Sequence, residues 1–363
     1  MKSKELKIIF IVLGIVILAV LLLNIAVKQL FRYYYKNYII PTTPVSLVGS
    51  FEDFVENGEN KPAEKICAGV NVNGLESVQG YDIAKHYLTD IKTFMNIKRQ
   101  GFDHVRLPVN FSYFYSIEDD ALIEEKMVLV DSILDLIEQT GLYTFLDLHG
   151  IWGFDVSDQK LYDQIVRMWE LVAERYKDRS DMLSFEIINE PKYGEGKYNK
   201  FLRDVIKAIR KTNPTRMILC GSSDGNQPWT LNNLDLPDSD ENLGVVVHIY
   251  NPGDFTHQGF EWAGRKAGVK VSLSDEMYEE LLWNLNETKK FIDRTGHKVF
   301  INEFGMNLVL PDQKDIERYL GTITEFCRDN EIPWTYWAYN SGDMSLFANR
   351  KWRTSILDTL FLR

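Results

Sequence analysis

The sequence predicts a (β/α)₈ TIM barrel preceded by an N-terminal transmembrane helix. Three observations support this fold class: an uncharged apolar run near the N-terminus, eight short apolar segments separated by longer amphipathic ones, and reactive side chains at the ends of most short segments. Strands separated by helices form parallel βαβ units, and eight such units close into a barrel. The 363 residues, of which 45% are apolar, suffice for one such domain with a sizeable core.

The apolar run extends over Ile8–Val27 and contains no charged residue. At about 1.5 Å per residue, a helix of this length spans the roughly 30 Å hydrocarbon core of a bilayer. We therefore expect residues 1–36 to form a signal anchor with a juxtamembrane segment, residues 37–60 a tether, and residues 61–363 the barrel. Secretion after signal cleavage is the alternative, although the run is longer than that of an ordinary signal peptide. Basic residues flank both ends, so charge gives no orientation.

Eight apolar segments are candidate strands: Ile66–Val72, His104–Pro108, Tyr143–His149, Leu183–Glu190, Arg216–Gly221, Val245–Tyr250, Val299–Phe304 and Trp334–Tyr339. Between them lie amphipathic helices such as Met127–Thr140, which Gly141 would end, and Tyr162–Tyr176. A doubly wound open sheet is the rival architecture. That fold has a glycine-rich phosphate turn after its first strand, and the segment Gly69–Gly74 here does not supply its G-x-G-x-x-G pattern.

Most of these segments end in side chains capable of chemistry: Asn71, Arg106, His149, Asn189 with Glu190, His248 with Tyr250, Glu303 and Trp337. In a barrel the C-terminal ends of the strands share one face, and that face carries the active site. Glu190 and Glu303 fall on the predicted fourth and seventh strands, which face each other across the barrel mouth. Opposed carboxylates are what glycosidic cleavage needs, because one protonates the leaving oxygen while the other attacks or activates water.

The formal net charge of −11 argues against nucleic acid as a partner and is compatible with a neutral polysaccharide. Cys67, Cys220 and Cys327 have neither the number nor the spacing of a disulfide framework or a zinc site, so we expect buried thiols. No motif indicates a metal or another cofactor. The expected partners are a polysaccharide or oligosaccharide and, through the N-terminal helix, a membrane; we expect a monomer.

Six segments carry a more specific pattern: Gly101–Pro108, Leu146–Gly150, Asn189–Pro191, His248–Pro252, Asn302–Gly305 and Tyr336–Trp337. From about residue 64 to the C-terminus, the sequence resembles glycoside hydrolase family 5, particularly its bacterial endo-β-1,4-glucanases. The resemblance implies a retaining enzyme with Glu190 as the general acid/base and Glu303 as the nucleophile. The expected substrate is β-1,4-linked glucan. β-Mannan, xyloglucan and mixed-linkage glucan remain alternatives, because loops select the polymer. A polymeric substrate places the barrel outside the cell.

The two glutamates need different surroundings. Glu303 must stay ionised to attack, so a cation and hydrogen-bond donors are expected beside it, and Arg106 and Tyr250 fit. Glu190 must hold a proton near neutral pH, and His248 is placed to tune that proton. Structural core roles are the alternative for the histidines.

The resemblance also implies sugar contacts. Asn189 would donate to the sugar 2-hydroxyl, His149 would hold hydroxyls of the same ring, and Trp337 would form an apolar floor. Residues 251–275 exceed the usual length of a βα loop and are expected to wall the cleft, with Trp262 as a sugar platform. Trp152 and Trp229 are further platform candidates, with ordinary packing as the alternative.

Two other function classes compete with a glycosidase. A metal-dependent barrel hydrolase would use His149, His248, Asp147 and Glu303, but the sequence contains no H-x-H or H-E-x-x-H pattern. A membrane-tethered sugar-binding protein without catalysis is the second class. The sequence retains both carboxylates and their expected neighbours, so it gives no sign of lost catalysis.

Overall fold

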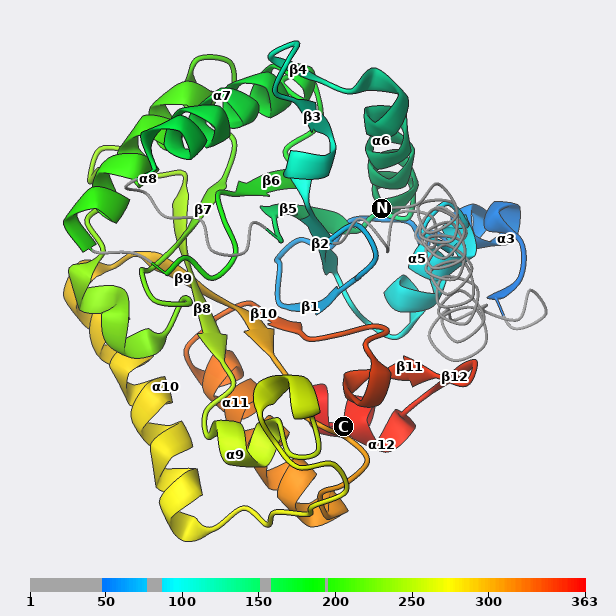
Figure 1. The fold of residues 1–363 in the computed structure, drawn as a ribbon. Helices are drawn as coiled ribbons and strands as arrows, with labels where there is room; N and C mark the ends of the chain where they lie inside the picture. The colour runs from blue at the N-terminus through cyan, green and yellow to red at the C-terminus, as the bar shows by residue number, and fades with distance from the viewer. Residues whose placement is uncertain (1–47, 77–86, 151–157, 193–194) are drawn as a thin grey trace, which may run out of the picture.

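Eight parallel strands form a closed barrel in the computed structural model, which describes residues 48–76, 87–150, 158–192 and 195–363. The strand order is β1-β10-β9-β8-β7-β6-β5-β2, and β1 pairs with both β10 and β2 (Figure 1). The predicted barrel is therefore confirmed. No helix within the described ranges combines the length and the apolarity needed to span a bilayer. The predicted membrane segment Ile8–Val27 lies outside those ranges.

The barrel strands are β1 Ala68–Asn71, β2 His104–Val109, β5 Tyr143–Leu148, β6 Leu183–Glu186, β7 Ile218–Gly221, β8 Leu243–Ile249, β9 Lys298–Phe304 and β10 Trp334–Tyr336. Two hairpins lie outside the barrel, β3 Tyr115–Ser116 with β4 Ala121–Leu122 and β11 Phe347–Ala348 with β12 Lys351–Trp352. The α-helices are α3 Phe51–Glu56, α5 Ile91–Arg99, α6 Glu124–Gln139, α7 Gln159–Arg175, α8 Glu195–Arg210, α9 Gly253–Thr256, α10 Asp275–Thr295, α11 Gln313–Asp329 and α12 Thr354–Leu360. Short 3₁₀ helices are η2 Phe111–Tyr113, η3 Pro228–Asn233, η4 Glu261–Ala263 and η5 Gly342–Met344.

The two helices predicted by periodicity form with shifted ends. Helix α6 ends at Gln139, and Gly141 follows with φ 70, a backbone conformation that glycine adopts without strain. Helix α7 begins at Gln159 because the side chain of Asp158 accepts a hydrogen bond from the amide of Leu161. The apolar pattern therefore located both helices, while a capping side chain sets the start of α7 but not that of α6, which follows Ile123.

Alternating side chains divide the core into two parts. Leu146 and Leu148 of β5 belong to the large cluster that joins the strands to the outer helices. Phe145 belongs to a separate small cluster inside the barrel, together with Leu219, Val246 and Phe300. Asp147 follows Phe145 on the same face of β5 and therefore lies one layer closer to the mouth. The strand pleat thus places charged side chains directly above an apolar plug.

The fourth barrel strand is shorter than the predicted segment Leu183–Glu190, because β6 ends at Glu186. The backbone of Glu190 has φ 42, which a strand cannot accommodate. Two hydrogen bonds still hold the intervening chain on the barrel, from the Ile187 amide to the Leu219 carbonyl and from the Asn189 amide to the Leu148 carbonyl. Glu190 therefore extends from a fixed loop above the strand.

The final part of the predicted tether, from residue 48 onward, packs on the barrel. Phe54 of α3 is fully buried in a cluster with Met95 of α5. The Arg99 guanidinium lies 5.3 Å from the centroid of the Phe54 ring and forms an ion pair with Glu59 at 2.6 Å.

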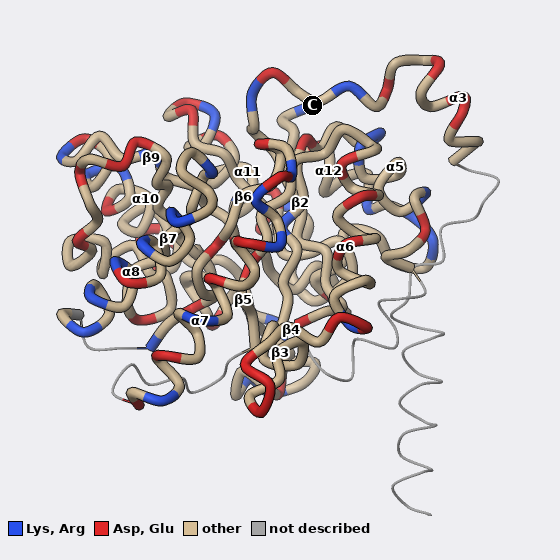
Figure 2. Tube along the Cα trace, turned by 90° about the horizontal axis from the view of Figure 1, so that it is seen from above, with Lys and Arg blue, Asp and Glu red and all other residues tan. Residues whose placement is uncertain are grey.

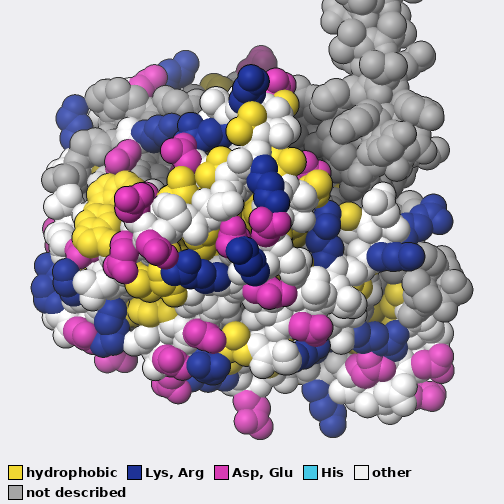
Figure 3. Space-filling view, turned by 90° about the horizontal axis from the view of Figure 1, so that it is seen from below, with side chains coloured by type: hydrophobic (Ala, Val, Ile, Leu, Met, Phe, Trp, Pro, Cys, Tyr) yellow, Lys and Arg dark blue, Asp and Glu magenta, His cyan; other side chains and the backbone are white. Residues whose placement is uncertain are grey.

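Surface charge is distributed over both signs. Figure 2 shows lysines, arginines and acidic residues spread over the outer helices, with acidic residues at the β3–β4 hairpin. Figure 3 shows basic and acidic side chains intermixed over the face seen from below, with hydrophobic side chains at the left edge and in smaller groups between the charged ones. The described part of that face is therefore a mixed surface without a large area of one sign.

Candidate active site

Arg106 of β2 is the centre of the charged layer at the mouth, and its side chain is fully buried. Its Nε and Nη2 atoms donate to the two carboxylate oxygens of Glu186 at 2.7 and 2.8 Å. Nη2 also lies 2.9 Å from Oδ2 of Asp147, and Nη1 bonds to Oε1 of Glu303. Burial alone would lower the pKa of Arg106, but these three carboxylates raise it well above its ordinary value. Arg106 therefore remains a cation.

Three carboxylates around one guanidinium leave an excess of negative charge. Asp147 and Glu186 are both fully buried. Burial raises the pKa of Asp147 to about 7, against the opposing effect of Arg106. Burial also raises the pKa of Glu186, again opposed by Arg106. This buried layer therefore takes up protons as the pH falls towards the acidic range.

Glu303, on β9, is held from two sides. Arg106 binds Oε1, and the hydroxyl of Tyr250 donates to Oε2 at 2.9 Å. The residue is only 4% exposed. Charge-assisted hydrogen bonds to both oxygens stabilise the ionised carboxylate and fix its direction. Glu303 is therefore arranged as a carboxylate that can attack.

Glu190 has different surroundings. Its side chain is 28% exposed, and Oε1 lies 3.0 Å from Nδ1 of His248. Burial raises the pKa of Glu190, while the charges of His149 and Arg106 oppose that shift. The pKa of His248 is lowered to about 4, mainly by burial. A neutral imidazole beside a carboxyl group of raised pKa leaves a site that can store and deliver a proton.

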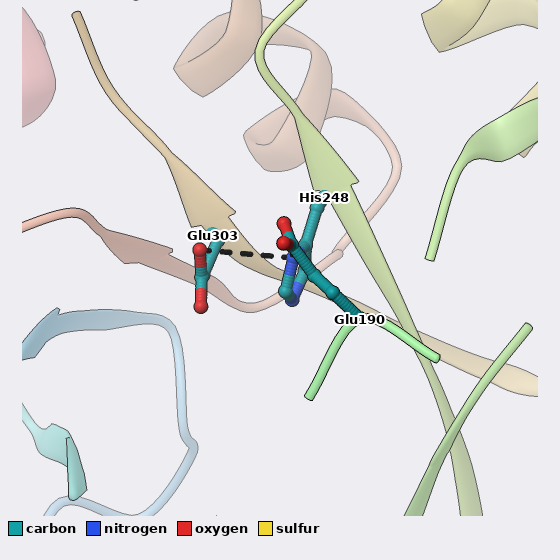
Figure 4. Close-up of side chains that lie close together, drawn as sticks. All are labelled: Glu190, His248 and Glu303. Carbon is teal, nitrogen blue, oxygen red and sulfur yellow. Dashed lines mark hydrogen bonds and ion pairs between the residues drawn. The ribbon is translucent and has the colours of Figure 1, made fainter. Parts of the chain in front are cut away.

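The two glutamates meet at one nitrogen of His248, Nδ1. A carboxylate oxygen of Glu190, one of Glu303 and a ring nitrogen of His248 all lie within 4.8 Å of one another. Figure 4 shows the side chains of Glu303 and Glu190 both directed towards the His248 ring, which β8 supplies, and Nδ1 of that ring lies 3.0 Å from Glu190 and 3.7 Å from Glu303. Retaining glycosidases have carboxyl groups about 5–5.5 Å apart, whereas inverting enzymes need roughly 6.5–9.5 Å to accommodate a water molecule. The separation here is in the shorter class.

The expected sugar-binding residues lie beside this pair. Nδ1 of His149 is 2.7 Å from Oδ2 of Asp147, and the His149 ring stacks on Trp337 with ring centroids 5.7 Å apart. Oδ1 of Asn189 accepts from Arg106 at 2.9 Å, which leaves its amino group as a donor. The structure thus brings together all eight residues of the predicted site: Arg106, His149, Asn189, Glu190, His248, Tyr250, Glu303 and Trp337.

The predicted platform tryptophans differ in their surroundings. Trp262, in η4, is 74% exposed and stacks on Phe260 with ring centroids 5.4 Å apart. It also contacts His257, whose ring packs edge-on against Tyr250 at 5.2 Å. The loop after β8 therefore connects this exposed indole to the site. Trp229 is 38% exposed and packs against Trp283 of α10 at 6.0 Å, while Trp152 lies outside the described residues.

Glu190, His248 and Glu303 also form a group that could hold a metal ion, as judged within the described ranges. Each candidate ligand already has a protein partner, since Nδ1 of His248 contacts Glu190 and Tyr250 donates to Glu303. Hydrogen bonds therefore complete the arrangement without an ion. Asp147, which the rival metal hypothesis also used, is engaged by Arg106.

Three residues were not assigned to the predicted site: Glu186, which binds Arg106; Asp147, which holds His149 and was considered only as a metal ligand; and Asn226, which contacts His248. A charged residue within a buried strand is the signal that could have identified Glu186 and Asp147. Asn226 lies in a loop, and the sequence gives no such signal there.

Comparisons with known proteins identify the family of this chain. The cellulase family model, glycosyl hydrolase family 5, matches residues 62–343. Endoglucanase C of Acetivibrio thermocellus is 26% identical over 325 residues, covering 77% of this chain and 93% of the relative. The crystal structure of cellulose synthase subunit Z from Clostridioides difficile has a TM-score of 0.73 at 27% identity, covering 82% of this chain and 99% of that one. A hyperthermophilic endo-β-1,4-glucanase solved with substrate has the same TM-score at 26% identity, covering 82% and 97%. The chain belongs to glycosyl hydrolase family 5, the cellulase family.

Proposed function

We propose that this chain cleaves β-1,4 bonds within glucan chains by double displacement, with Glu303 as nucleophile and Glu190 as acid/base. The observation that carries the proposal is the pair of opposed carboxylates within 4.8 Å, each in a different environment. Glu303 is fixed by Arg106 and Tyr250, whereas Glu190 lies partly exposed beside His248. The printed names of the relatives, endoglucanase and endo-β-1,4-glucanase, support glucan as the substrate.

In the first step, an oxygen of Glu303 attacks the anomeric carbon. The bond to the leaving oxygen breaks, and Glu190 gives its proton to that oxygen, so that a covalent glycosyl ester forms on Glu303. In the second step, the ionised Glu190 takes a proton from water, and the resulting hydroxide oxygen attacks the same carbon. The ester bond breaks, Glu303 regains its charge, and the released sugar has the original anomeric configuration.

The neighbouring side chains bind the ring at the reacting carbon. The free amino group of Asn189 donates to the 2-hydroxyl, a contact that strengthens as positive charge develops on the ring. The Nε2 side of His149 contacts hydroxyls of the same sugar, and Trp337 provides an apolar floor for the C–H face. Asp147 fixes the orientation of His149 through the bond to Nδ1.

Paired substitutions test the assignment of roles. Glu303→Ala should lose nearly all turnover, and azide or formate should restore part of it with a product of inverted configuration. Glu190→Ala should retain more activity on aryl glycosides whose leaving group needs no protonation. Glu331→Ala, at the opposite end of the barrel, is the matched control. Equal losses of both site variants on activated aryl glycosides would contradict the division of roles.

The polymer and the cleavage mode are tested with a panel of glucan, mannan, xyloglucan and mixed-linkage glucan. We expect the largest rate on β-1,4-glucan and a rapid fall in viscosity, which marks internal cleavage. A higher rate on mannan or xyloglucan would contradict glucan as the substrate without contradicting the double-displacement mechanism. Binding without product release would support the non-catalytic alternative.

The proposal includes attachment to a membrane through Ile8–Val27, with the barrel outside the cell. The support is the uncharged apolar run, whose length matches a bilayer. Cell fractionation followed by protease treatment of intact cells tests both points: the barrel should sediment with membranes and be digested from outside.

A further inference from the structure

His248 has a second contact, on the side of its ring away from Glu190. The amino nitrogen Nδ2 of Asn226 lies 3.3 Å from Nε2 of His248, while Nδ1 of His248 lies 3.0 Å from Oε1 of Glu190. Both Asn226 and His248 are 0% exposed. The imidazole therefore bridges a buried amide and the carboxyl group that supplies the proton.

Asn226 is held firmly in this position. Its carbonyl accepts a hydrogen bond from the His248 amide at 2.9 Å, so the two backbones are joined. Its side chain packs over Gly221, where an added Cβ would lie 1.9 Å from Oδ1 of Asn226. Its φ of 58 is in the left-handed region, which asparagine tolerates better than most residues. Backbone and side chain are both fixed against His248.

The orientation of the amide decides which nitrogen of His248 accepts. With Nδ2 directed at Nε2, one amino hydrogen of Asn226 is paired, while Oδ1 and the second amino hydrogen have no partner among the described residues. The reverse orientation would leave both hydrogens of the amino group unpaired against Gly221. A buried carbonyl without a partner is less uncommon than a buried amide donor without one. Asn226 therefore donates, and Nε2 of His248 accepts.

The charged groups facing His248 agree with a neutral ring. Burial lowers the pKa of His248 to about 4, and the charges of Arg106 and His149 act in the same direction. Glu303 and Glu186 act in the opposite direction without overcoming burial. A neutral imidazole has a single ring hydrogen, and because Nε2 accepts, that hydrogen is on Nδ1.

We propose that Asn226 is a positioning residue that fixes the tautomer of His248 and thereby the oxygen of Glu190 that carries the acid proton. Nδ1–H of His248 donates to Oε1 of Glu190, so Oε1 is occupied as an acceptor. The proton of Glu190 is then held on Oε2, where it is free to move to the leaving oxygen. Without Asn226, the ring can adopt the other tautomer, accept the Glu190 proton at Nδ1 and hold it away from the substrate. The inference rests on the proposed acid role of Glu190.

Asn226→Gly removes the amide and suits the positive φ, so the backbone need not change. We expect kcat/KM on glucans and on aryl cellobiosides with poor leaving groups to fall about tenfold, the scale of one hydrogen bond. The value on activated aryl cellobiosides should fall much less, because their departure needs no proton. The readout is therefore the slope of log kcat/KM against leaving-group pKa, which should become steeper.

Asn284→Ala is the matched control. Asn284 is 1% exposed, donates to a backbone carbonyl at 2.9 Å and has an unpaired Oδ1, but it lies on α10 outside the site. A loss of stability from removing any buried amide would appear in both variants. A change in leaving-group slope should appear only in Asn226→Gly. Equal slopes in Asn226→Gly and in the unmodified protein would overturn the proposal.

Nitrogen NMR of the imidazole gives a readout that needs no activity. We expect the unmodified protein to carry the His248 hydrogen on Nδ1 and Asn226→Gly to show Nε2–H or a mixture. If the glycine variant does not fold, Asn226→Asp serves instead, because its new carboxylate accepts from Nε2–H and should move the hydrogen there. A hydrogen on Nε2 in the unmodified protein refutes the proposal. An inactive protein with the expected tautomer would refute the proposed glucanase function alone.

Discussion

Replacing Arg106 by methionine tests the buried charge layer most directly. The substitution removes the cation that contacts Glu186, Asp147 and Glu303 while leaving a side chain of similar length. All three carboxylates are nearly or fully buried, so water cannot take the place of the guanidinium. We expect a large loss of stability together with the loss of activity. Arg106→Lys is the matched control, because it keeps the charge but cannot form the paired bonds to Glu186.

The size of the effect follows from the burial. Removing one partner from a buried ionic group costs about 3–5 kcal/mol, because the remaining charge is uncompensated. An unfolding entropy of about 2.1 cal/mol/K per residue over roughly 300 ordered residues converts each kcal/mol to about 1.5 °C in Tm. Arg106→Met should therefore lower Tm by about 5–8 °C. Arg106→Lys should lower it by less than half of that.

The stability lost in Arg106→Met should be smaller at acid pH than at alkaline pH. Burial holds the pKa of Asp147 at about 7, above its ordinary value of 3.8, and Arg106 opposes that shift. A raised native pKa gives stability that is present below about pH 4 and disappears as the pH rises through 7. Without the guanidinium the native pKa rises further, so the deficit of the methionine variant should shrink towards acid pH. Calorimetry at pH 5 and pH 8 measures this; equal deficits at both, or a change in Tm under about 2 °C, would refute the reasoning.

Further predictions concern single contacts. Tyr250→Phe removes the hydroxyl that donates to Glu303, and kcat/KM should fall roughly 10–100-fold, as expected for a hydrogen bond to a charge. Asp147→Asn removes the carboxyl group whose pKa is about 7, so the pH dependence of the unfolding free energy between about pH 4 and 7 should flatten in urea titrations. Trp262→Ala should reduce the rate several-fold on long glucans and less on a short aryl cellobioside, as steady-state kinetics would show. Dialysis against a chelator should leave activity unchanged, because protein hydrogen bonds already engage Glu303.

The barrel was predictable because parallel strands buried on both faces are short apolar runs separated by helices. The ends of the strands were less predictable. Leu183–Glu190 remains apolar through Ile187 and Ile188, yet β6 ends at Glu186. The cause is the left-handed backbone of Glu190, a non-glycine residue, which apolar patterning does not encode. The packing of residues 48–60 on α5 likewise depends on contacts of Arg99 that only the folded chain reveals.

The sequence predicts which residues form the site better than it predicts the hydrogen bonds that orient them. Side chains at the ends of the strands converge because the barrel gives those ends one face. The partners that orient them come from positions one layer deeper, such as Glu186 on β6, or from loops, such as Asn226 after β7. The alternation of side chains along β6 places Glu186, whereas a backbone with positive φ places Asn226. Loop partners such as Asn226 can therefore be identified only from the folded chain.

The different roles proposed for the two glutamates arise from where the fold places them. Glu303 is part of β9, so the barrel itself aligns it with Arg106 from β2, and a rigid carboxylate bound at both oxygens is suited to attack. Glu190 lies four residues beyond β6, on a left-handed backbone position where one oxygen meets His248 and part of the side chain meets solvent. The acid/base gives a proton to the leaving oxygen in the first step and takes one from water in the second, so it must be reached by water, whereas the nucleophile must be held in place. The position of Glu303 in a strand and of Glu190 in a loop therefore gives two identical side chains the different surroundings that their roles need.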